Sequence, residues 1–340
     1  MIRFAIALAA LLFVATPVAA ASFDCSKAQT PFEKAICSDP DASLQDDILA
    51  QAYATALGGL SADAASEVKA AQRAWLGYAE RSCSDDAEPI PTDYTDEQKQ
   101  CLAGVFRFRT RDLEASRMIG GFRFYPIDRY LVEPDTEAMP EDFVKVADKQ
   151  YQIVKIDRAD EVAVAFNAMI DTLIAGQGAF FDPGTTTIAT DDPTSDYDIT
   201  TKVTDVTSQR ISLQTNEYWS GHGAAHGNYF ITNRHFLVKE KRLLEASDIF
   251  EGDKWEERLG KLALDAIKAK LGEDYFANSD EDVMKIVVDP LRWDFSEAGL
   301  IVQFNIYEVT AYAFGTPTVT IGWDKFERNL ADDAETIAYY

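Results

Sequence analysis

The chain has 340 residues, of which 47% are hydrophobic and 26% charged, a composition that excludes disorder of the whole chain. At roughly 100–200 residues per domain, this length predicts two domains or three. Lys and Arg total 32 and Asp and Glu total 57, so the formal net charge is −25. An acidic surface repels phosphate backbones and anionic membranes, so we expect no nucleic-acid partner. It would attract a cationic partner, although solubility alone also explains it.

Residues 1–20 have the pattern of a secretory signal peptide. Arg3 precedes an apolar run over 4–14, which is shorter than the roughly 20 residues that cross a bilayer. Small residues follow, and we expect cleavage after Ala20 or Ala21. No later segment is long and apolar enough to predict a membrane span. The sequence therefore predicts a periplasmic or secreted protein.

Four cysteines lie in the first third of the chain: Cys25, Cys37, Cys83 and Cys101. An even number in an oxidising compartment indicates two disulfides. Of the three possible pairings we predict Cys25–Cys37 and Cys83–Cys101, because each pair brackets a short segment. There is no Cys-x-x-Cys and no histidine nearby in sequence, so we expect no metal site. The clustering predicts a small N-terminal domain held by disulfides.

Helix signals dominate the chain up to about residue 119. Thr30-Pro31-Phe32-Glu33 is a capping box with proline at the first helical position. We expect Ser43 to cap a second helix, a third to span about 62–82, and a fourth to begin near Thr95. Gly120-Gly121 is expected to end the fourth helix and to mark the domain boundary.

Strand signals dominate after residue 121, with interspersed helices expected after Asp157 and over 255–270. Residues 176–197 are expected to form an exposed loop. Strands and helices come in blocks, so the predicted fold class is α+β with a largely antiparallel sheet. The predicted division is a signal peptide (1–20), a helical domain (22–118) and an α+β domain (122–328). We expect the run at 318–323 to close the sheet. The expected strands lie within 122–132, 151–156, 199–203, 210–213, 229–238, 300–306 and 318–323.

The three histidines, His222, His226 and His235, lie within 14 residues of one another. His222 and His226 have the spacing of two metal ligands on a helix, but the surrounding glycines argue against a helix. No glutamate follows His222, so the zinc-protease motif is absent. We predict a glycine-rich hairpin or loop with structural histidines. A hydrolase that uses both histidines stays as an alternative.

Other catalytic signatures are also absent from the sequence. There is no Gly-x-Ser-x-Gly, no Gly-x-Gly-x-x-Gly and no P-loop. Pairs of carboxylates carry no signal in a chain with 57 acidic residues. We therefore expect no enzyme, no catalytic residue and no cofactor.

The segment 307–317 joins two strand-like runs and carries three aromatic residues. Tyrosine is enriched at recognition surfaces, because its ring is apolar and its hydroxyl is polar. A recognition loop and a loop whose rings pack beneath it are equally compatible with this pattern.

The first third of the chain resembles the N-terminal domain of the lysozyme-inhibitor LprI type. That resemblance covers residues 22–113 and implies a helical, extracytoplasmic bacterial domain, some relatives of which inhibit lysozyme. The residues that carry it are Asp24 to Ala28, Thr30 to Cys37, Leu44-Gln45-Asp46, Tyr53, Gln72 to Leu76, Cys83, Cys101-Leu102 and Arg107 to Leu113.

Residues 122–328 resemble the DUF3298 domain, also called RsiV-like or PdaC-type. One branch of that family senses lysozyme, and another accompanies a polysaccharide deacetylase domain, which has no counterpart here. Ala311 and Gly322 stand where the family usually has proline, so the fine geometry of that loop is expected to differ. The residues that carry the resemblance are Gly223 to Gly227, Phe236, Leu243 to Phe250, Gly299 to Phe304, Tyr307 to Val309 and Tyr312 to Gly315.

Both resemblances imply lysozyme or the peptidoglycan that it cleaves as the ligand. We therefore predict a binding protein that blocks the cleft of a lysozyme-type muramidase, with Glu308 pairing to an arginine of the cleft. The alternative is a protein of the cell envelope that binds peptidoglycan or another glycan. Neither the oligomeric state nor the class of lysozyme follows from the sequence. The predicted ligand-binding residues are Tyr307, Glu308, Tyr312, Phe314 and His226.

Overall fold

The structure is a computed structural model, and four stretches of the chain are described. The predicted signal peptide (1–20) and most of the predicted loop at 176–197 lie outside them. Across these stretches, no helix combines the length and the apolar character that a bilayer crossing needs. The described residues are 21–139, 141–176, 193–326 and 328–339.

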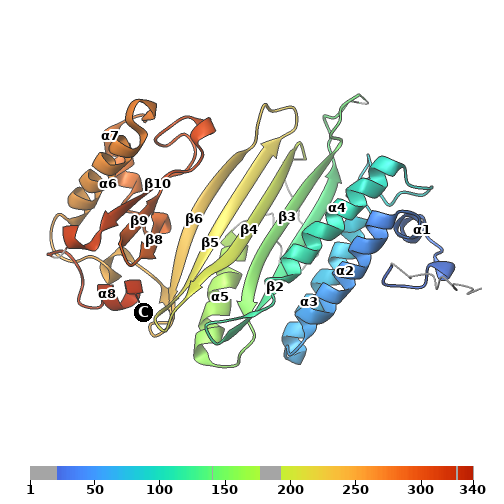
Figure 1. Ribbon diagram of the computed structural model, residues 1–340, viewed down its shortest axis with the longest axis horizontal. Coiled ribbons are helices and arrows are strands. Elements are labelled where there is room, and N and C mark those ends of the chain that lie inside the picture. Colours follow the sequence, from blue (N-terminus) through green and yellow to red (C-terminus); the bar gives the residue numbers. More distant parts are fainter. Residues whose placement is uncertain (1–20, 140, 177–192, 327, 340) are drawn as a thin grey trace, which may run out of the picture.

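The N-terminal region is helical, as predicted, and its helices stand beside one edge of the main sheet (Figure 1). Both predicted disulfides are present, Cys25–Cys37 and Cys83–Cys101. The capping box between Thr30 and Glu33 starts the first helix. The helices are α1 (Pro31–Ser38), α2 (Pro40–Leu57), α3 (Ala62–Ala79) and α4 (Asp96–Leu113).

Two predicted boundaries in this region are wrong. Asp39, not Ser43, caps α2, because its carboxylate accepts hydrogen bonds from the backbone of Asp41 and Ala42 while Pro40 occupies the first helical position. Ser43 is buried inside the helix. Gly120 and Gly121 do not end α4. They form the turn between β1 and β2, where both have positive φ, at 56° and 83°.

A seven-stranded sheet forms the middle of the molecule, in the order β1-β2-β3-β4-β5-β6-β7. All of its pairs are antiparallel except β3 with β4, which α5 (Glu161–Gly176) connects as a crossover. Asp160, not the predicted Asp157, caps the start of α5. The strands are β1 (Met118–Ile119), β2 (Phe122–Pro134), β3 (Val146–Ile156), β4 (Ser195–Val206), β5 (Arg210–Gly221), β6 (Asn228–Leu237) and β7 (Arg242–Leu243).

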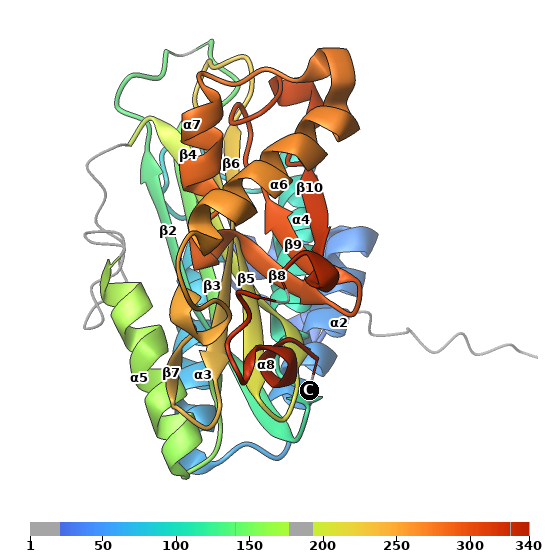
Figure 2. The ribbon, with the colours of Figure 1, turned by 90° about the vertical axis from the view of Figure 1, so that its left-hand side faces the viewer.

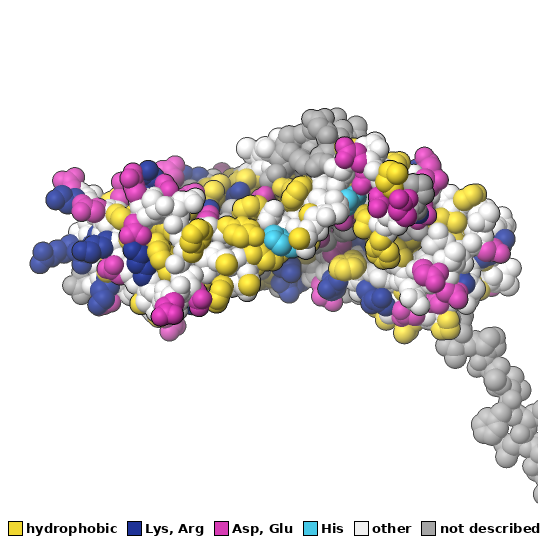
Figure 3. Space-filling view, turned by 90° about the horizontal axis from the view of Figure 1, so that it is seen from above, with side chains coloured by type: hydrophobic (Ala, Val, Ile, Leu, Met, Phe, Trp, Pro, Cys, Tyr) yellow, Lys and Arg dark blue, Asp and Glu magenta, His cyan; other side chains and the backbone are white. Residues whose placement is uncertain are grey.

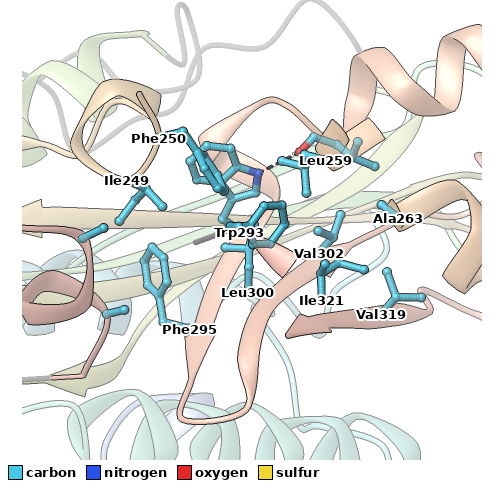
Figure 4. Packing of buried hydrophobic residues seen from close by; sticks show 14 of the residues in the cluster. Ile249, Phe250, Leu259, Ala263, Trp293, Phe295, Leu300, Val302, Val319 and Ile321 are labelled. Atoms are coloured by element: carbon cyan, nitrogen blue, oxygen red, sulfur yellow. Dashed lines mark hydrogen bonds between the residues drawn. The ribbon is translucent and has the colours of Figure 1, made fainter. Parts of the chain in front are cut away.

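The C-terminal strands form a second, three-stranded antiparallel sheet in the order β10-β9-β8. The expectation that the run at 318–323 closes the main sheet is therefore wrong. Trp293 is fully buried in the core of this region and donates from Nε1 to the carbonyl of Val287 at 2.7 Å (Figure 4). The elements are α6 (Trp255–Leu271), α7 (Asp280–Ile286), β8 (Trp293–Ser296), β9 (Gly299–Gln303), β10 (Thr318–Gly322) and α8 (Ala334–Tyr339).

The helical region and the main sheet share their cores. Trp75 and Phe106 belong to the same buried cluster as Tyr130 of β2, and Val68 of α3 packs in the cluster that holds Phe124. Figure 2 shows α5 on one side of the sheet and α2 and α4 on the other. The predicted domain limits, 22–118 and 122–328, therefore separate two regions that pack directly against each other.

Candidate functional site

The loop between β9 and β10 brings aromatic side chains to one end of the main sheet, next to the turn between β5 and β6. Within it, Tyr312–Phe314 form a single 3-10 turn. We use the name aromatic surface for the side chains gathered here: Tyr218, His226, Tyr229, Tyr307, Tyr312 and Phe314.

Direct ring contacts hold the aromatic surface together. The His226 ring stacks on Tyr312, with centroids 3.9 Å apart and an interplanar angle of 20°. The Tyr307 hydroxyl lies 3.2 Å from Nε2 of His226, and the Tyr229 ring meets Tyr312 edge-on at 5.9 Å. Residues 81 positions apart in the sequence therefore form one cluster.

Much of the aromatic surface is open to solvent. Tyr307 and Phe314 are each 51% exposed, and Tyr218 is 42% exposed. In Figure 3, hydrophobic side chains gather around a histidine on this end of the molecule. Large exposed apolar side chains that lie together are typical of a site for protein or ligand contact.

An internal ion pair holds the loop in place. Arg292 Nη2 donates to Glu308 Oε1 at 2.7 Å, and the two side chains are only 17% and 18% exposed. The other carboxylate oxygen accepts from the backbone N–H of Asn305 at 2.6 Å. Both oxygens of Glu308 therefore have partners within the chain, and the structure places this residue as an anchor of the loop. Its predicted contact with an arginine of a bound partner is untested.

A second anchor joins the loop to the edge of the main sheet. The Asn305 side chain accepts from the backbone of Ile231 at 2.7 Å and donates back to its carbonyl at 3.3 Å. The amide thus pairs with the backbone N–H and C=O groups of Ile231 in β6, as a neighbouring strand would. Tyr307, two residues later, has a φ of 62°, which is rare for a residue with a Cβ. Anchors on both sides hold this strained tyrosine in position.

The three histidines have separate roles. His222 hydrogen-bonds through Nδ1 to Asp135 and through Nε2 to Asp196. Burial disfavours the charged form of His222, but these two carboxylates outweigh burial and raise its pKa. His235 is buried, and burial lowers its pKa to about 4. As predicted, His222 and His226 lie in a glycine-rich hairpin.

The described residues contain no group of three His, Cys, Asp or Glu side chains that could hold a metal ion. His226 faces tyrosines rather than acids. Within the described residues the two histidines thus have different partners: carboxylates of Asp135 and Asp196 contact His222, and tyrosines contact His226.

Sequence reasoning missed the part of the aromatic surface that comes from β5 and β6. Tyr218 and Tyr229 are direct cross-strand partners, and Tyr218 is 42% exposed. The signal was present, because aromatic residues flank the glycine-rich turn on both sides. Only the docking of the β9–β10 loop onto β6 shows that they join Tyr307 and Tyr312.

Comparison with known proteins gives two family matches and several similar solved structures, among them two DUF3298 family proteins. A DUF3298 family protein from Bacteroides fragilis is 15% identical, covers 65% of this chain and 98% of its own, and has a TM-score of 0.48. A second, from Pseudomonas aeruginosa, is 12% identical, covers 62% and 95%, and has a TM-score of 0.44. No curated protein matches the chain.

The two family matches cover opposite ends of the chain. Residues 25–113 match the family described as lysozyme inhibitor LprI, and residues 247–324 match DUF3298, described as a protein of unknown function. The chain thus carries an LprI region followed by a DUF3298 region, in the order that the sequence predicts.

Proposed function

We propose that this protein binds a lysozyme-type muramidase outside the cytoplasm, through the aromatic surface and without catalysis of its own. The observation that carries the proposal is the LprI match over residues 25–113, since that family is described as a lysozyme inhibitor. The two disulfides agree with an oxidising compartment. Blocking of the muramidase cleft would account for inhibition.

The geometry of the aromatic surface supports its role as the contact region. Tyrosine and other aromatic residues dominate the energetics of many protein interfaces, because they bury a large area at a low cost in side-chain entropy. The ion pair of Arg292 with Glu308 and the amide of Asn305 hold the loop before any partner arrives. Binding would therefore order few additional groups, which favours affinity.

The charge of the chain supports a cationic partner. Cleavage after residue 20 would remove only one charged side chain, Arg3, and leave 31 basic against 57 acidic residues. A field of this sign would accelerate encounter with a cationic lysozyme.

Surface plasmon resonance with a panel of lysozymes tests the proposal. Tyr312→Ala removes the ring that His226, Tyr229 and Tyr307 all contact. A central aromatic contact costs about 2 kcal/mol or more on truncation, so dissociation should accelerate roughly 30-fold. Phe143→Ala is the control, since Phe143 is fully exposed in the loop between β2 and β3.

Two outcomes would count against the proposal. Unchanged dissociation in a folded Tyr312→Ala variant would remove the aromatic surface as the contact region. Absence of binding to every lysozyme, with cosedimentation of the wild type with peptidoglycan sacculi, would favour the glycan-binding alternative. Stacked rings suit that alternative as well, because aromatic faces also bind sugars.

A further inference from the structure

A cavity of about 420 Å³ lies between α4 and the main sheet, away from the aromatic surface. The helix contributes Phe108 and Asp112 to its wall, and the strands contribute Asp128, Gln152 and Asp198. This volume is within the range of pockets that hold small molecules, roughly 300–1,000 Å³.

Three neighbouring strands present polar side chains to this cavity, beside apolar ones such as Val154 and Val203. Asp128 of β2 pairs in register with Gln152 of β3, and Gln152 pairs with Thr200 of β4. All three line the cavity. The residues one step along β2 and β4, Ile127 and Ile199, pack in the buried cluster that holds Phe166 of α5. A helix that only covered a sheet would pack on apolar side chains, so the polar side chains at these positions require another explanation.

Acidic groups outnumber basic ones inside the cavity. Asp112 and Asp128 are buried there, and Asp198 is half-buried. The buried cation beside them is Arg109, which pairs with Asp128 and donates to the Tyr130 hydroxyl at 2.7 Å. The hydrogen bonds of Asp112 to other described side chains come from neutral groups, the Gln152 amide at 2.5 Å and the Tyr130 hydroxyl at 3.1 Å. Burial and the charge of Asp128 raise the pKa of Asp112 to about 7.

One carboxylate oxygen in the cavity wall has no partner in the described part of the chain. Asp128 is 1% exposed, and its Oδ1 makes no hydrogen bond. The Nη2 group of Arg109 is likewise buried without a partner. Buried polar groups of folded proteins are nearly always satisfied by protein, water or a ligand, so these two atoms are candidates for contact with a bound group.

The rim has the opposite charge to the floor. Arg111, Arg117 and Lys202 are exposed at the edge of the cavity, and none forms an ion pair with another described residue. Glu114 is the one acidic side chain among the exposed rim residues that are described. A ligand that entered here would meet cations outside and carboxylates inside.

We infer that this cavity binds a small molecule with a protonated amine at one end and a carboxylate at the other, such as an amino acid or a short peptide. The ammonium would lie against Asp112, Asp128 and Asp198, and the carboxylate would remain near Arg111 and Lys202. A bound metal ion does not fit, because no group of three acidic or histidine side chains in the described chain is arranged to hold one. The inference is independent of lysozyme binding.

Isothermal titration of the full chain with L-alanyl-L-alanine at pH 7.5 tests this site. The dipeptide is a minimal probe with both charged ends, and we expect a Kd below about 1 mM. N-acetyl-L-alanyl-L-alanine lacks the ammonium and should bind at least tenfold more weakly. Asp112→Asn should weaken the dipeptide at least tenfold, whereas Asp96→Asn, an exposed change on the same helix, should leave its Kd unchanged.

Asp198→Asn provides a second test if Asp112→Asn fails to fold, because Asp198 lies on the sheet and is only half-buried. Equal affinity for the dipeptide and its acetylated form would overturn the inference. Unaltered binding in both aspartate variants, or no binding of the dipeptide by the folded wild type, would overturn it as well. Tighter binding of the dipeptide that depends on Asp112 or Asp198 would support it.

Discussion

The aromatic surface and the cavity under α4 are held in place in different ways. The rings of the aromatic surface lie on a loop and a hairpin, and Tyr307 and Phe314 are half exposed. The cavity is lined by side chains that also join the helical region to the sheet: Asp112 of α4 bonds to Gln152 of β3, and Asp128 of β2 pairs with Arg109 of α4. Substitutions on the aromatic surface should therefore change binding with little effect on folding. Substitutions in the cavity should change both.

The largest expected effect is on stability, from Arg109→Met. This change leaves Asp128 in the core without a counter-charge, and breaking one partner of a buried ion pair costs about 3–5 kcal/mol. Arg107→Met, on the same helix, breaks a pair with Asp41 whose side chains are about half exposed, and should cost less than about 1 kcal/mol. Urea unfolding of both variants measures the difference. Equal stabilities would show that the helix and the sheet do not depend on the buried pair.

The second prediction concerns pH and the buried acids of this junction. Burial, with a nearby carboxylate in each case, raises the pKa of Asp112 and of Asp148 to about 7. In the unfolded chain an aspartate has a pKa of about 4. Between about pH 4 and 7 the folded state therefore keeps protons that the unfolded state releases. The contribution of these two acids to stability is therefore greatest below this window and falls as pH rises through it.

Asp112→Asn should make this fall shallower, by on the order of 2–4 kcal/mol between pH 4 and 8, because the variant no longer ionises at this position. Asp96→Asn, which changes an exposed side chain, should leave the fall unaltered. Urea denaturation at several pH values gives both curves. Parallel curves for wild type and Asp112→Asn would contradict the raised pKa.

Local sequence signals predicted the elements well. The capping box at Thr30, the two disulfides and the glycine-rich hairpin are all as expected, because each depends on residues close in sequence. The predicted start of α2 was wrong because two nearby residues can both cap a helix. Asp39 and Ser43 are both good caps, and the proline after Asp39 decides between them.

Long-range arrangement could not be predicted in the same way. Asp112, Asp128 and Asp198 lie on a helix and two strands, and in a chain with 57 acidic residues nothing in their local sequence distinguishes them. The split into two sheets also depends on which strands pair. The sequence predicted the β9–β10 loop as an aromatic segment. It could not show that Glu308 anchors this loop, because that role depends on the position of Arg292, 16 residues earlier.

The third prediction compares how salt affects binding at the aromatic surface and binding in the cavity. Raising ionic strength from 0.01 to 0.15 M shortens the Debye length from about 30 to about 8 Å. Association of a cationic lysozyme should then slow by roughly tenfold, while its dissociation changes little. The dipeptide in the cavity should lose less affinity, since buried charges are screened less. Stopped-flow kinetics and titration at the two salt concentrations test this. If salt weakened lysozyme binding and dipeptide binding by the same factor, the charges in the cavity would not be shielded from solvent as we infer.

The smallest expected effect comes from the strained tyrosine of the aromatic surface. Tyr307 has a φ of 62°, where glycine is unstrained and other residues are disfavoured by about 1 kcal/mol. Tyr307→Gly should therefore be more stable than Tyr307→Ala by up to about 1 kcal/mol in thermal unfolding. Both variants lose the ring that contacts His226 and Tyr312, so both should weaken lysozyme binding equally. Strain at a site of recognition is expected where the position of a side chain matters more than stability. If the alanine variant is the more stable one, the anchors at Asn305 and Glu308 do not hold residue 307 in this conformation in solution.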